Sequence, residues 1–108
     1  MFVVNLGGEG EVSGALNQQG PWVLAPGWVS SQTRKTLAEL SADGHRFLIC
    51  PNDRIALPDA CVGEVVTNSV PIDGNTWLGP GVQSSEIRRI LKVGGKWFHD
   101  GNLRWTKP

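Results

Sequence analysis

Glycines and a carboxylate stand directly after the first apolar segment of this chain. Residues 2–6 form a short apolar run typical of a buried strand, and Gly7, Gly8, Glu9 and Gly10 follow it. Glycine tolerates positive φ angles and lets the backbone come close to a ligand. This loop therefore predicts contact with the phosphate, ribose or amino-acid part of a cofactor. Glu9 is equally well explained as a solvated turn residue.

Polar and aromatic side chains also follow the later apolar segments. They are Trp28, Asn52, Asp53, Asn68, His99 and Asp100. His99 and Asp100 predict a general base with its orienting carboxylate, since a histidine beside a carboxylate titrates near neutrality. An ordinary turn at the end of a strand explains the same two residues, and Asn68 is also typical of a turn. Trp28 is expected on a loop, where a large ring often lines a pocket.

The elements that position these residues alternate between strand and helix patterns. Strands are expected at residues 2–6, 21–26, 46–50, 62–67 and 96–99. Helices are expected at 30–42 and 84–92, and Gly94 is the stop signal of the second one. This alternation predicts an α/β fold, with a parallel sheet covered on both faces. Ligands bind beyond the carboxyl ends of the strands in such sheets, so most candidate residues are expected on one rim.

The composition narrows the class of protein. The 108 residues are expected to form one domain, 1–108, and ten basic and ten acidic residues give a formal net charge of zero. The sequence contains no block of like charges, so a nucleic-acid surface is not expected. The longest apolar run is too short for a membrane span and the start lacks a signal-peptide pattern, so a cytoplasmic protein is expected. Cys50 and Cys61 stand apart without a metal-ligand spacing, which predicts buried free thiols and no metal site.

Four segments, in the right order, resemble the class I S-adenosylmethionine-dependent methyltransferases. Residues 3–10 are similar to the glycine-rich first motif of that family, and 48–53 to its third strand with the acid that faces adenine. Residues 57–68 and 87–95 are similar to its fourth-strand segment and to its helix followed by a glycine pair. The resemblance implies a three-layer Rossmann-like fold, with a mainly parallel five-stranded sheet in the order 3-2-1-4-5.

The resemblance also implies a cofactor and roles for the candidate residues. The cofactor is S-adenosylmethionine, with S-adenosylhomocysteine as the product. The implied contacts are Gly7, Gly8, Glu9 and Gly10 around the amino-acid and ribose parts, Asn52 and Asp53 near adenine, Asn68 near the methyl group, and His99 or Asp100 at the substrate mouth. Trp28 is then a wall of the pocket. The acceptor is a small molecule or a protein.

The chain departs from the family pattern in ways that favour a second interpretation. Asn5 stands where the family usually has an acid, and no carboxylate ends the expected second strand. The chain is also similar to reduced methyltransferase-like domains of bacterial polymorphic toxins. The alternative is a non-catalytic module for cofactor or protein binding and dimerisation. The expected sheet lacks the usual C-terminal hairpin, and Leu103 and Trp105 predict that a homodimer covers the edge left open.

Overall fold

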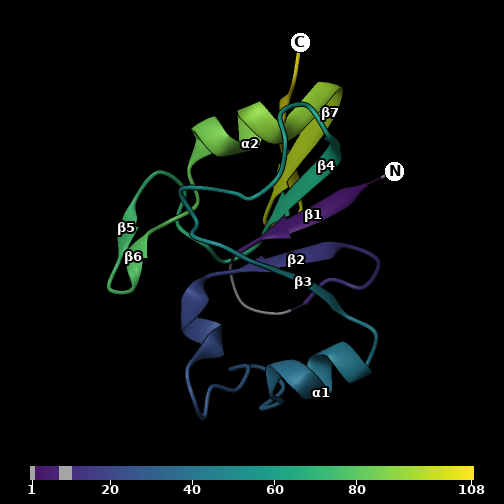
Figure 1. The fold of residues 1–108 in the computed structure, drawn as a ribbon. Coiled ribbons are helices and arrows are strands. Elements are labelled where there is room, and N and C mark those ends of the chain that lie inside the picture. Colours follow the sequence, from purple (N-terminus) through teal and green to yellow (C-terminus); the bar gives the residue numbers. More distant parts are fainter. Residues whose placement is uncertain (1, 8–10) are drawn as a thin grey trace.

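A six-stranded, mostly parallel sheet organises the chain (Figure 1). The computed structural model describes residues 2–7 and 11–108. In order across the sheet, the strands are β3 (Arg46–Ile49), β2 (Leu16–Gln19), β1 (Val3–Leu6), β4 (Val62–Thr67), β7 (Leu91–His99) and β8 (Asn102–Thr106). The first five are parallel and β8 is antiparallel to β7. The α/β class and the 3-2-1-4-5 order of the parallel strands are confirmed.

Few helices accompany this sheet. They are the 3-10 helix η1 (Pro21–Leu24), α1 (Leu37–Ala42) and α2 (Ser84–Ile90). Figure 1 shows α1 and α2 at opposite ends of the molecule, with the sheet between them. A small hairpin made of β5 (Asn75–Thr76) and β6 (Gly79–Pro80) projects from the connection between β4 and α2. None of the helices within the described ranges is long and apolar enough to cross a membrane.

The second strand was predicted at the wrong place. Residues 21–26 contain η1 instead, because Pro21 has no N–H to give to a sheet and its fixed φ suits the first turn of a helix. The strand is Leu16–Gln19, where the side chains of Asn17 and Gln18 are fully buried. A polar strand of this kind has no apolar signature, so hydrophobic periodicity does not reveal it.

Both helices are shorter than predicted. α1 starts only after Thr36, which forms a capping box with Glu39. α2 ends at Ile90 and the chain passes at once into β7, so Gly94 does not end the helix. Gly94 has a φ of +80°, and a Cβ on Gly95 would lie 2.8 Å from the carbonyl oxygen of Lys92. The glycine pair therefore lets β7 bend where its register with β4 shifts.

The predicted absence of a C-terminal hairpin is wrong. β8 pairs with β7 in register Trp97↔Trp105 and His99↔Asn102, so the same chain covers the edge that was expected to be open. Trp105 is half-buried against the core, and the guanidinium of Arg88 lies 5.5 Å from its ring centroid. The edge of β7 is therefore not open to a second copy of the chain. The homodimer stays a prediction.

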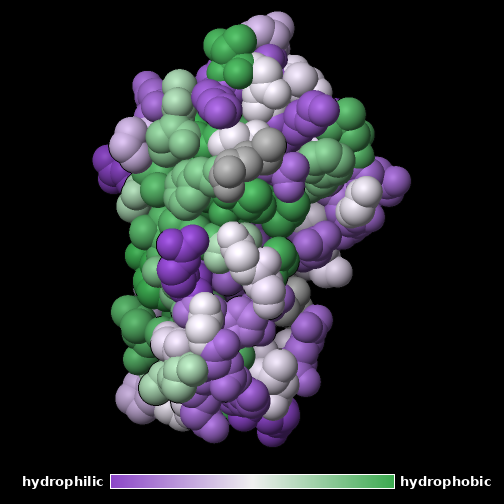
Figure 2. Space-filling model, turned by 90° about the vertical axis from the view of Figure 1, so that its right-hand side faces the viewer, coloured by the Kyte–Doolittle hydropathy of each residue, from purple (hydrophilic) through white to green (hydrophobic). Residues whose placement is uncertain are grey.

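The core lies between α2 and one face of the sheet. Side chains alternate along a strand, so one set from β1, β4 and β7 meets the inner face of α2. This cluster includes Val4, Leu6, Val65, Trp97, Ile87 and Ile90. On the opposite face Val66 and Phe98 are only half-buried, so the expected cover on both faces is partial. Figure 2 shows hydrophobic residues gathered across the middle and along the left side of this face, while hydrophilic ones cover most of its lower part at the level of α1.

Replacing Trp105 tests whether β8 belongs to the folding unit. Trp105→Ala is expected to lower the free energy of unfolding by about 2 kcal/mol, less than the roughly 3–5 kcal/mol of a fully buried tryptophan. Trp77→Ala is the matched control, because Trp77 is 92 % exposed and its loss should change stability by less than about 0.5 kcal/mol. Urea unfolding followed by circular dichroism measures both. Equal effects of the two variants would show that β8 is not docked.

Candidate functional site

A pocket of about 550 Å³ opens beyond the carboxyl ends of the parallel strands. Residues that follow β1, β2, β3 and β4 all contribute to its wall. They include Glu11, Trp22, Trp28, Asn52, Ser69 and Trp77. Its volume falls within the roughly 300–1,000 Å³ of small-molecule sites. This is the place where open parallel sheets bind ligands, at the point where the connections from β1 and β4 diverge.

The described residues that line the strand-end pocket include a negative charge and no positive charge. Glu11 supplies a carboxylate, and Trp22, Trp28 and Trp77 supply three indole rings. Among the described residues that line it there is no lysine or arginine. The faces of indole rings attract cations, and a carboxylate repels phosphate. The pocket therefore suits a cationic or neutral ligand better than a phosphorylated one.

Two buried amides, of Gln18 and Asn52, connect the strand ends to the pocket, which Asn52 lines. Gln18 accepts the N–H of Gly7 at 2.8 Å through Oε1, and its Nε2 donates to the Cys50 carbonyl at 2.7 Å and to Asn52 Oδ1 at 3.2 Å. Asn52 Nδ2 donates onward to the carbonyl of Pro80 at 3.1 Å. The amides thereby tie the ends of β1, β2 and β3 to the hairpin β5–β6. No pattern in the sequence marks Gln18 for this role.

Gly7 occupies a position that other residues would strain. Its φ is +59°, and a Cβ would lie 3.0 Å from a Val70 methyl group and 3.1 Å from a Val82 methyl group. The N–H of Gly7 is already donated to Gln18, so Gly7 positions the loop rather than offering its N–H to a ligand. Gly8, Glu9 and Gly10 lie outside the described residues.

The structure brings together only some of the other predicted cofactor residues. Trp28 and Asn52 both line the strand-end pocket. Asp53 is exposed and lines a neighbouring pocket instead. Asn68 lies on the opposite face of the sheet, beside Val66 and Phe98 in a shallow pocket of about 280 Å³. Asp53 and Asn68 are therefore separated from Trp28 and Asn52.

His99 and Asp100 form the predicted pair. The Nε2 atom of His99 lies 3.3 Å from Asp100 Oδ2, and Asp100 Oδ1 accepts the N–H of Ser69 at 2.8 Å. This geometry arises because β7 ends at His99 and Asp100 turns away with a φ of +49°. Ser69, itself at a φ of +52°, lines the strand-end pocket, so the pair is connected to the rim of the pocket through one backbone bond.

Thr67 holds the other side of the His99 ring. Its Oγ1 accepts the indole N–H of Trp97 at 2.9 Å and lies 2.8 Å from His99 Nδ1. With the indole donating to Oγ1, the hydroxyl proton is free to donate to Nδ1, which leaves the Nε2 proton for Asp100. Thr67, His99 and Asp100 thus have the order of a nucleophile, base and acid. Thr67 is fully buried, however, so it orients the histidine and does not attack a substrate.

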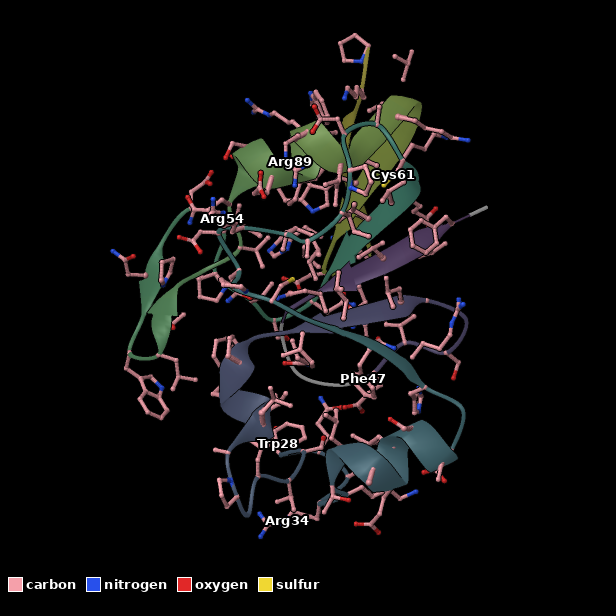
Figure 3. All side chains as sticks on the ribbon, in the orientation of Figure 1. Trp28, Arg34, Phe47, Arg54, Cys61 and Arg89 are labelled. Carbon is pink, nitrogen blue, oxygen red and sulfur yellow. The ribbon has the colours of Figure 1, made fainter. Side chains whose placement is uncertain are left out.

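The neighbouring pocket, of about 840 Å³, is built around a structural ion pair. Figure 3 shows Arg89 reaching from α2 toward the loop that carries Arg54. Arg89 Nε donates to Glu86 Oε2 at 2.8 Å, and its other nitrogens donate to the carbonyls of Ile55 and Leu57. These bonds fix residues 51–60 against α2. The site is larger than the strand-end pocket, but its half-buried Arg89 is engaged by Glu86, Asp59 and two backbone carbonyls.

The two cysteines remain free thiols. Cys50 is buried, as predicted, and burial raises the pKa of its thiol. Cys61 is only half-buried. Over residues 2–7 and 11–108, no three His, Cys, Asp or Glu side chains gather in a way that could hold a metal ion.

Comparisons of this chain with known proteins found no similar protein. No protein-family model matches the chain, and neither the curated proteins nor the solved structures show a match. The geometry of the strand-end pocket is therefore the basis for any functional proposal.

The Glu86–Arg89 pair predicts a measurable pH dependence of stability. The hydrogen bond from Arg89 holds the pKa of the Glu86 carboxyl below its usual value. A carboxyl whose pKa is lowered on folding stabilises the protein above its unfolded pKa of about 4.3, and this stabilisation is lost as the pH falls through the folded pKa. Glu86→Gln should cost about 1–2 kcal/mol at pH 7 and nothing once the carboxyl is protonated.

Urea unfolding of the wild type and Glu86→Gln at pH 7, 5, 4 and 3 measures this difference. The two stability curves are expected to converge as the pH falls below about 5. Other carboxyls with lowered pKa values, such as Asp73 and Glu39, are present in both proteins and cancel in the comparison. A constant gap between the curves would contradict the assigned role of the ion pair.

Proposed function

We propose that the strand-end pocket binds S-adenosylmethionine and that the chain transfers its methyl group to an acceptor, releasing S-adenosylhomocysteine. The observation that carries the proposal is the chemistry of the pocket wall, with three indole rings, the carboxylate of Glu11 and no cation among its described residues. S-adenosylmethionine bears a sulfonium and an ammonium group, which such a wall attracts. Phosphorylated cofactors of similar folds would meet repulsion instead.

The topology supports the same cofactor. The parallel strands follow the order 3-2-1-4-5 that the resemblance implies, and the pocket lies at their carboxyl ends. Asn52 is the better candidate of the adjacent pair for the adenine, since Asp53 faces the neighbouring pocket. Glu11 is the candidate for the side of the cofactor that carries the sulfonium, because a carboxylate attracts positive charge.

In methyl transfer, the main task of the protein is to position the cofactor and the acceptor. Trp28, Asn52 and Glu11 would hold S-adenosylmethionine, which would supply an electrophilic methyl group to a nucleophile placed in line with its carbon–sulfur bond. Holding the two reactants in that geometry, away from water, supplies most of the acceleration. Thr67 and Asp100 engage the two ring nitrogens of His99, so His99 orients Asp100, which in turn holds the backbone of Ser69 at the rim of the pocket.

Calorimetric titration tests cofactor binding. S-adenosylmethionine and S-adenosylhomocysteine are expected to bind at least about tenfold more tightly than ADP, which carries the same adenosine with negative charge. Trp28→Ala should weaken both by about tenfold, because the ring loses its stacking and cation contacts. Leu24→Ala is the matched control on η1, since Leu24 is 63 % exposed and lies outside this pocket. Equal or tighter binding of ADP would overturn the proposal.

A further inference from the structure

We infer that Trp77 is the platform for the methyl acceptor and that the acceptor is a planar aromatic amine. The inference deepens the proposed function and rests on it for the transfer step. It begins with the exposure of Trp77, which is 92 % although the residue lines the strand-end pocket. An indole offered to solvent at the rim of a pocket has one face free for a flat ligand.

The hairpin that carries Trp77 is held in place by its own hydrogen bonds. At the tip, Thr76 Oγ1 accepts the N–H of Leu78 at 3.1 Å and donates to the carbonyl of Gly79 at 2.9 Å. At the base, the N–H of Gly81 donates to the carbonyl of Gly74 at 2.7 Å. The buried amide of Asn52 holds the carbonyl of Pro80. The exposed ring is therefore presented by an ordered element rather than by a free loop.

The size of the exposed tip favours a small ligand over a protein. Trp77 and Leu78 are the large apolar residues at the tip, and Leu78 is 43 % exposed. A stable protein interface buries about 800 Å² on each partner and has several anchors around a dry centre. Two side chains at the end of a narrow hairpin are too few for that. A single planar ring, stacked on one indole, matches what the tip offers.

The charge of the pocket specifies an amine. Glu11 is the charged group among the described lining residues, so an acceptor seated between Trp77 and the pocket interior meets a carboxylate. A carboxylate orients an amine by accepting its N–H, whereas it repels an acid or a phosphate. The ring face of Trp77 also attracts the positive charge that develops on the nitrogen during transfer.

Methyl transfer from the sulfonium to an amine needs no further reactant. The amine nitrogen attacks the methyl carbon, a nitrogen–carbon bond forms, and the carbon–sulfur bond breaks with its electron pair moving to sulfur. The positively charged sulfonium becomes a neutral thioether, and the nitrogen becomes an ammonium. The amine enters this step in its neutral form, with a lone pair on nitrogen, and the methylated ammonium then releases one proton to water while its N–H is bonded to the carboxylate of Glu11.

Titration with three probes of similar size tests the inference on protein saturated with S-adenosylhomocysteine. The probes are tryptamine, 2-cyclohexylethylamine and indole-3-propionic acid, which separate planarity from charge. Tryptamine is expected to bind at least about fivefold more tightly than either of the others. Trp77→Ala should weaken tryptamine by about tenfold, while Trp77→Phe should keep its affinity within about threefold. Glu11→Gln should remove the preference for the amine over the acid.

Controls separate the failure of this inference from that of the proposed function. Trp77 is one of the three indoles of the pocket wall, so each variant is first titrated with S-adenosylhomocysteine and tryptamine is added at saturation, which separates the loss of tryptamine affinity from any loss of cofactor affinity. A far-UV circular dichroism spectrum like that of the wild type shows that Trp77→Ala is folded. Leu24→Ala, an exposed apolar change outside the pocket, should leave tryptamine binding unchanged. Binding of S-adenosylhomocysteine with no preference for tryptamine would overturn the inference alone. Tryptamine binding without any affinity for either cofactor form would overturn the proposed function.

Discussion

The arrangement of the site depends on one buried side chain, the amide of Gln18. It is fully buried, and its oxygen and nitrogen are bonded to the backbone of β1 and of the segment after β3. An amide buried without partners costs about 1–3 kcal/mol, so these bonds are required once the side chain is in the core. Asn52 continues the network to Pro80 at the base of the hairpin. The strand ends and the pocket rim are therefore fixed by amide geometry, where larger folds use packed helices.

The hydrogen bonds of these buried amides compensate for the small part of the sheet that helices cover. The connection from β1 to β2 contains no helix among its described residues, and α2 alone packs on the main core. On the other face, Asn5 Nδ2 donates to Asn17 Oδ1 at 3.0 Å, and Asn17 also bonds the backbone of Val12 and Arg46. Polar side chains that satisfy neighbouring strands thus replace part of an apolar layer. A chain of 108 residues can hold six strands in this way.

These buried polar side chains explain why some strands could be predicted from the sequence and β2 could not. The third and fourth strands are apolar and were located within one residue. A parallel sheet followed from the alternation of strand and helix patterns, whereas the order 3-2-1-4-5 came from the resemblance to the methyltransferases. β2 was missed because its interior residues are amides, which look like a loop until their partners are known. Trp28 and Asn52 were selected because they follow apolar segments, and the structure places both at the strand-end pocket. The role of Thr67 depends on a contact with His99, 32 residues away, that no local pattern encodes.

The neutral composition conceals an uneven distribution of charge that matters for the pocket. Residues 86–108 hold six of the ten basic side chains and two of the ten acidic ones. Within that part, the guanidiniums of Arg88 and Arg104 lie over the rings of Trp105 and Trp97, at 5.5 and 5.2 Å from their centroids. Arg89 is bound by Glu86. Arg88, Arg89 and Arg104 are thus held by aromatic and acidic neighbours, and Lys107 Nζ donates to the carbonyls of Arg88 and Leu91. A formal net charge of zero therefore does not fix the sign of the field at a site, which follows from where the fold places each group.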